Sequence, residues 1–98
     1  MRKVLIKVGI RNNVRTYYVM RLIKNFAGYF YKPFDRIKCS DVSVAKYVVP
    51  NWVKKDEVFV IFSNLADGGF VKYYFHPKYR KWYKNLTEKD IEKYFPWL

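Results

Sequence analysis

The feature of the sequence that most restricts the fold is an unbroken apolar run at residues 58–62, which Glu57 precedes. Its valines, phenylalanines and isoleucine favour a strand, because branched and aromatic side chains pack well on a pleated surface. Successive side chains of a strand point to opposite faces, so a strand without polar positions must be covered on both sides. We therefore predict that residues 57–62 form a central strand of a sheet.

The segment that follows predicts a hairpin. Asp67, Gly68 and Gly69 are residue types that tolerate the backbone angles of tight turns, which places a turn at residues 63–69. Residues 70–75 then alternate as a second strand, and Pro77 ends it because proline cannot donate to a sheet ladder. The alternation directs Val71, Tyr73 and Phe75 to one face and Lys72, Tyr74 and His76 to the other.

Residues 2–10 also alternate with a period of two, which predicts a half-buried strand. A loop at residues 11–13 keeps the apolar positions of this strand and the next on one face. Its register sets Ile10 opposite Val14, Val8 opposite Thr16, Ile6 opposite Tyr18 and Val4 opposite Met20. The opposite face of this hairpin then gathers Lys3, Lys7, Arg15, Tyr17 and Arg21.

A helix over residues 14–25, ended at Gly28, is the alternative for the second half of this hairpin, since Val14, Tyr18 and Leu22 also share one helical side. The Tyr-Tyr-Val run favours the strand. Residues 27–31 predict a short third strand that Pro33 closes.

Two helices are expected in the rest of the chain. Ser40 is the predicted N-cap of a short middle helix that Pro50 ends, and a loop at residues 51–56 follows, anchored to the core by Trp52. Thr87 is the predicted N-cap of the C-terminal helix, and Asp90 stands at the third helical position in a variant of the capping box. Ile91, Tyr94 and Phe95 form its apolar side, Pro96 stops it, and Trp97 and Leu98 close the edge of the core.

These elements predict a single domain of the α+β class, because 98 residues have material for one core. We expect an antiparallel sheet of about four or five strands with a short middle helix and a C-terminal helix packed on one face. With the helices on the core face, the other face of the sheet would be left to present polar and aromatic side chains.

The charge of the chain predicts its class of partner. The net charge is +12, from 20 basic and eight acidic residues, and glutamate occurs only at positions 57, 88 and 92. Most cations therefore have no acidic counterpart, and such an excess attracts polyanions. The basic residues concentrate before residue 35 and between residues 68 and 87, where no acid occurs.

The strongest local signal for function is the stretch at residues 72–84, which consists of five basic and six aromatic residues with His76 and Pro77. Cations neutralise phosphates, while aromatic rings offer faces on which unpaired bases stack. The alternative is that Tyr73, Phe75 and Trp82 belong to the core. The predicted nucleic-acid-binding residues are Lys72, Tyr74, His76, Lys78, Tyr79, Arg80, Lys81, Trp82 and Lys84, together with Lys3, Lys7, Arg15, Tyr17 and Arg21 from the N-terminal hairpin.

The residues that catalysis would need are scarce. His76 is the single histidine and Cys39 the single cysteine, too few for a zinc site, and no glycine-rich phosphate loop occurs. We therefore expect no cofactor, no metal and no enzymatic activity. The least favoured alternative is a metal-dependent nuclease, for which Asp56 and Glu57 would be the candidate ligands at the start of a strand.

The sequence thus predicts non-enzymatic, largely sequence-independent binding of DNA or RNA, with single strands slightly preferred. The alternative is a protein interaction module that docks on an acidic partner, as a viral protein or a host-factor-binding protein would, because tyrosine, tryptophan and arginine also mark protein interfaces.

The sequence also predicts the cellular compartment of the protein. A lone cysteine favours a reducing interior, and neither a signal peptide nor a membrane span is expected, so we predict a soluble, cytoplasmic protein.

The absence of glutamine and the abundance of Lys, Tyr and Ile resemble the composition of small orphan proteins of hyperthermophilic archaea and their viruses. This resemblance implies an intracellular, heat-stable homodimer that acts on nucleic acid or host factors, in the host cell if viral.

Overall fold

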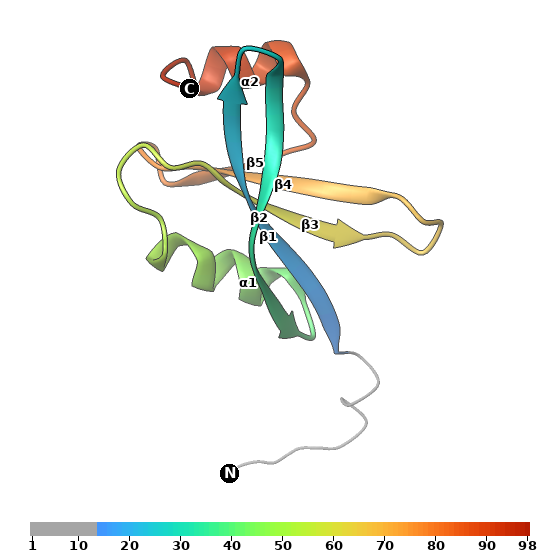
Figure 1. Cartoon of the computed structure of the whole chain (residues 1–98). Coiled ribbons are helices and arrows are strands. Elements are labelled where there is room, and N and C mark those ends of the chain that lie inside the picture. Colours follow the sequence, from blue (N-terminus) through green and yellow to red (C-terminus); the bar gives the residue numbers. More distant parts are fainter. Residues whose placement is uncertain (1–13) are drawn as a thin grey trace.

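The computed structural model describes residues 14–98 of the chain, which form an antiparallel five-stranded sheet and two α-helices (Figure 1). In chain order the elements are β1 (Arg15–Asn25), β2 (Gly28–Cys39), α1 (Val42–Val48), the 3-10 helix η2 (Val49–Asn51), β3 (Phe59–Asn64), β4 (Phe70–His76), β5 (Lys81–Lys84) and α2 (Glu88–Tyr94). The strand order is β2-β1-β3-β4-β5, so β3 is the central strand. The predicted α+β class is confirmed.

From Val58, directly before β3, to Ile61 the chain is buried on both faces of the sheet, as this apolar run requires. Val58 and Val60 lie on one face and Phe59 and Ile61 on the other, each with 1% exposure or less. The helices pack on opposite faces of the sheet, and Figure 1 shows the sheet between α1 and α2. The expectation that both helices share one core face was wrong, because a fully apolar central strand needs a cover on each side.

Two clusters of buried side chains make up the core. The cluster under α1 contains Tyr17, Val19, Ala45, Val49, Phe59 and Ile61. The cluster under α2 contains Leu22, Val58, Val60, Tyr74, Ile91 and Phe95.

Residues 15–25 form a strand rather than a helix, but the strand has other partners than those predicted. β1 pairs with β2 along its whole length and with β3 at residues 18–21. Tyr18 and Met20 therefore have a neighbour on each side and are not available for the predicted pairs with Ile6 and Val4. The predicted strand at residues 2–10 and the loop at 11–13 lie outside the described residues.

β2 continues well past Pro33, where the sequence predicted its end. Within the described sheet it is an edge strand, where a residue without an N–H, such as Pro33, is tolerated. The register shifts at the same place: Val19 lies opposite Asp35 and Met20 opposite Pro33, which leaves Phe34 as an extra residue. The Phe34 ring packs on Phe59, with 4.8 Å between the ring centroids.

The short helix α1 begins one residue later than predicted. Asp41, not Ser40, is the N-cap, and its carboxylate accepts a hydrogen bond from the Ser43 N–H at 3.1 Å. Pro50 ends the α-helix as expected, although the chain continues for one 3-10 turn, η2. Trp52 packs against the core under α1, as predicted.

The strand β5 was missed because its four residues, Lys81–Lys84, have charged ends and no apolar alternation. A tight turn connects it to β4. Arg80 adopts a positive φ of 57° in this turn, and its N–H donates to the carbonyl of His76 at 2.9 Å.

Helix α2 begins as predicted. The Thr87 hydroxyl accepts from the Asp90 N–H, and the Asp90 carboxylate accepts from the Thr87 N–H, each at 3.2 Å. Trp97 and Leu98 pack against the core under α2, also as predicted. Among residues 14–98 no helix has the length and apolar character to cross a bilayer.

Replacement of the two candidate N-caps of α1 tests the start of this helix. Asp41→Ala should lower the free energy of unfolding by about 1 kcal/mol, because a helical N–H loses its acceptor. Ser40→Ala should change it by less than about 0.5 kcal/mol, as expected of an exposed residue without such a bond. Urea denaturation of both variants measures the difference, and a larger loss for Ser40→Ala would contradict the assignment.

Candidate nucleic-acid interface

The basic and aromatic stretch at residues 72–84 does not form one surface. β4 and β5 are paired antiparallel, so residues opposite one another share a face. The α2 face receives the pairs Tyr74 with Tyr83 and His76 with Lys81, and the α1 face receives the pairs Tyr73 with Lys84 and Phe75 with Trp82. The sequence predicted the alternation of β4 correctly but not its consequence, which is that the cations are divided between two sides of the sheet.

Tyr74 lies too deep to contact a ligand. It is 1% exposed beneath α2, and its hydroxyl makes a short hydrogen bond with the hydroxyl of Tyr31. Burial raises the pKa of Tyr74 far above its ordinary value, so the phenol keeps its proton at neutral pH. The structure contradicts the predicted stacking role of Tyr74, because that role needs an exposed ring.

His76 organises the turn between β4 and β5 instead of binding phosphate. The ring is 2% exposed, and its Nε2–H donates to the carbonyl of Tyr94 at 2.9 Å. Its Nδ1 accepts from the N–H groups of Lys78 and Tyr79 at 3.2 and 3.1 Å. Both ring nitrogens are satisfied only in the neutral form, and burial lowers the pKa of His76. The prediction that His76 is part of the binding surface was wrong.

The other predicted residues of this stretch reach the surface at separate places. Lys78 Nζ lies 4.4 Å from the Trp97 ring centroid, and the Arg80 guanidinium lies 5.1 Å from that of Phe75. Tyr79 is 67% exposed, with one ring face stacked on His76. Lys81 and Lys84 are exposed at the two ends of β5, and Trp82 is half-buried on the α1 side. The exposed cations remain available for phosphates.

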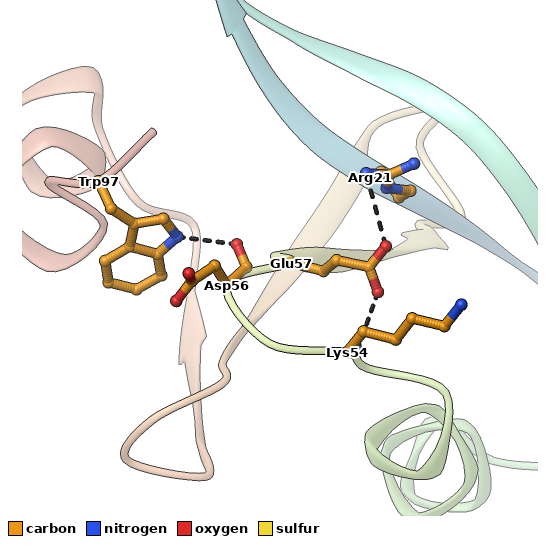
Figure 2. Close-up of polar contacts among 5 residues, drawn as sticks. All are labelled: Arg21, Lys54, Asp56, Glu57 and Trp97. Atoms are coloured by element: carbon orange, nitrogen blue, oxygen red, sulfur yellow. Dashed lines mark hydrogen bonds and ion pairs between the residues drawn. The ribbon is translucent and has the colours of Figure 1, made fainter.

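The predicted residues of β1 share the α1 face of the sheet but differ in exposure. Tyr17 is 3% exposed in the core under α1, contrary to its predicted place on a binding surface. Arg21 forms an ion pair with Glu57, with 3.5 Å between Nη2 and Oε2 (Figure 2). Arg15 is exposed, and Lys3 and Lys7 lie outside the described residues.

The candidate nuclease ligands serve the loop before β3. Figure 2 shows Glu57 between Arg21 and the Lys54 N–H, which donates to its carboxylate at 2.9 Å. The main-chain carbonyl of Asp56 accepts from the Trp97 indole at 2.8 Å. Among the described residues no three His, Cys, Asp or Glu side chains gather where they could hold a metal ion.

A different set of side chains forms a continuous surface on the α2 face of the sheet. Arg36 lies opposite Tyr18 on β1, Tyr18 lies opposite Phe62 on β3, and Phe62 lies opposite Lys72 on β4. Four adjacent strands thus present a row in which two aromatic rings stand between two cations. We call the exposed part of this face the sheet platform; its residues are Tyr18, Tyr31, Arg36, Lys38, Phe62, Phe70 and Lys72.

Three of the four rings of the sheet platform contact one another, and the platform remains accessible. Phe62 lies 5.0 Å from Tyr31 and 5.5 Å from Phe70 between ring centroids. Tyr18 is 43% and Phe70 48% exposed. Lys72 Nζ lies within 5.9 Å of the ring centroids of both Tyr31 and Phe62. The platform therefore combines ring faces with positive charge.

The platform is open because α2 is short. A helix of seven residues is only about 10 Å long, whereas five strands side by side span about 19 Å. Ile91 of α2 and its C-cap Phe95 pack over Leu22 and Tyr74 in one cluster, which leaves Tyr18 and Phe70 uncovered.

Sequence reasoning missed the platform residues on β1 and β2. Adjacent strand residues point to opposite faces, so Tyr17 and Tyr18 lie on different sides of the sheet, and of the two Tyr17 is the buried one. The predicted hairpin placed Tyr18 on the core face and Tyr17 on the binding surface, which is the reverse of the structure. Arg36 and Lys38 were not predicted to belong to a strand, because the third strand was expected to end at Pro33. The adjacent pair of tyrosines was the signal that could have indicated an outward ring.

The buried neutral ring of His76 predicts a pH-dependent stability. Its pKa is lowered in the folded state from the ordinary 6.5, so the unfolded state binds the proton more tightly. The stabilisation is complete above about pH 6.5 and is lost as the pH falls through the folded pKa. Urea denaturation at pH 7.5 and 5.5 should show the loss.

The ring signals of the single histidine report its pKa directly in an NMR titration. A folded-state pKa at or above 6.5 would contradict the neutral role of His76.

The sheet platform thus offers aromatic ring faces beside positively charged side chains. Comparisons of this chain with protein-family models, curated proteins and solved structures find no match.

Proposed function

We propose that this protein is a non-enzymatic binder of single-stranded nucleic acid and that the sheet platform is its binding surface. The observation that supports this proposal is the row Arg36, Tyr18, Phe62 and Lys72 across four paired strands. The two central rings can stack on bases, and the cations at both ends of the row can neutralise phosphates of the same strand.

Base stacking supplies the attraction that does not depend on sequence. Stacking of a base on an aromatic side chain is worth about 1–3 kcal/mol, and every base has a flat face to offer. Paired bases in a duplex stack on one another and do not expose that face, so the platform favours single strands. Neighbouring strands are about 4.8 Å apart, which places the Tyr18 and Phe62 side chains within one nucleotide of each other.

Charge supplies the rest of the affinity. Arg36, Lys38 and Lys72 border the rings, and no acidic residue stands in the row or at the adjoining positions Thr16, Asn64 and Phe70. The net charge of +12 attracts a polyanion from a distance. The exposed cations Lys78, Arg80, Lys81 and Lys84 would add phosphate contacts outside the platform. Because the proposed ligand is nucleic acid, we also propose that the protein acts in the cytoplasm.

Replacement of the most central exposed ring tests the platform. Tyr18→Ala should weaken binding of a labelled single strand by about 1–3 kcal/mol, because one stacking face is lost. Tyr47→Ala is the matched control, since Tyr47 is 80% exposed on α1, on the other side of the sheet. Fluorescence anisotropy measures both affinities, and circular dichroism confirms that both variants are folded. Equal losses for the two variants would contradict the placement.

A pair of double variants with the same change in charge tests the electrostatics. Arg36→Ala with Lys72→Ala should reduce the slope of log K against log salt by about 1.4, because two phosphate contacts are lost. Arg80→Ala with Lys84→Ala removes the same charge outside the platform and should reduce the slope less. Anisotropy titrations between about 50 and 200 mM salt measure both slopes.

Absence of binding to DNA and RNA strands at about 50 mM salt would contradict the proposed function. The sheet platform would then be a docking surface for an acidic protein.

A further inference from the structure

The sheet platform ends at a fork between two hairpins. The ladder between β1 and β3 stops at the pair Tyr18 and Phe62. The next pair on the same face would be Thr16 with Asn64, but among residues 14–98 these two residues pair outward, with Lys38 and Phe70. β1 and β3 therefore separate from one another directly beside the row of rings.

A cleft occupies this fork. Its volume is about 410 Å³, and its lining consists of Arg15, Thr16, Tyr17, Tyr18, Asn64, Leu65 and Ala66. Small-molecule sites measure about 300–1,000 Å³, so the cleft has room for one nucleoside-sized group. Thr16 precedes Tyr18 by two residues and Asn64 follows Phe62 by two residues. Both therefore lie on the same face as these rings.

We propose that this cleft receives one purine base of a strand that lies on the sheet platform, and so gives an otherwise sequence-independent binder a preference at one position. The inference rests on the proposed function and deepens it. Tyr18 belongs to both the row and the lining, so a strand stacked on the platform passes the mouth of the cleft.

The residues of the cleft select a purine by hydrogen bonding. An asparagine amide recognises adenine through N6 and N7, and an arginine recognises guanine through O6 and N7. Both contacts use N7, an atom that only purines present. Asn64 and Arg15 are exposed at the two sides of the cleft, and the Thr16 hydroxyl adds a donor and an acceptor. Pyrimidines have no N7 and cannot form these two bidentate contacts.

The test compares two labelled strands of about twelve nucleotides, a length within the range of one small binding domain. One contains thymidine throughout, and the other has one internal adenosine, because adenine is the base that the Asn64 amide recognises. The wild-type protein should bind the purine-containing strand about tenfold more tightly, near the lower limit for a bidentate base contact. Asn64→Ala combined with the isosteric Thr16→Val should abolish this advantage and leave the affinity for the thymidine strand within about twofold, because the stacking rings are unchanged.

Asn51→Ala is the matched control, since Asn51 is an exposed asparagine in η2, away from the cleft. It should keep the purine advantage in full. Equal affinity of the wild-type protein for both strands would overturn the purine inference and leave the proposed function intact, and so would an advantage that survives in the Asn64 and Thr16 variant. Failure to bind either strand would overturn both.

Discussion

The structure depends on one constraint, which is that the central strand β3 is apolar on both faces. Val58 and Val60 on one side and Phe59 and Ile61 on the other are excluded from water. Each face therefore needs its own cover, and residues 14–98 provide one α-helix of seven residues for each. Helices of this length cover the sheet only in part. The part of the α2 face that α2 does not reach therefore remains open. Aromatic side chains and cations occupy that area, as the sheet platform.

Local patterns in the sequence predicted the elements that depend on neighbouring residues. The capping box of Thr87 and Asp90 indicates the start of α2. The order of side chains within β4 is enough to predict which of them point to each face. The choice between Tyr17 and Tyr18 could not be made locally, because it depends on which strands flank β1, and a shift of one residue exchanges the faces. The four-residue β5 was not predicted for the same reason. It forms a strand because it pairs with β4 and because His76 holds the turn between them.

The function of the aromatic residues depends on where the fold places them. Tyr74 and His76 looked like ligand-binding residues beside the cations of β4, yet α2 covers both, and their hydrogen bonds stabilise the core and a turn. Tyr18 and Phe70 lie in less basic surroundings in the sequence but are exposed next to Lys72, Arg36 and Lys38 in space. Burial therefore separates the aromatic residues that hold the structure together from those that are free to stack on a base.

NMR mapping of the binding surface tests the central claim most directly. Addition of a short single strand to isotope-labelled protein should shift the amide signals of Tyr18, Phe62, Phe70 and Lys72 on neighbouring strands, in one continuous patch on the α2 face. The amides of α1 should move little, because that helix lies on the opposite side of the sheet. Shifts confined to α1 or to the turn at residues 77–80, with the platform signals unmoved, would contradict the account.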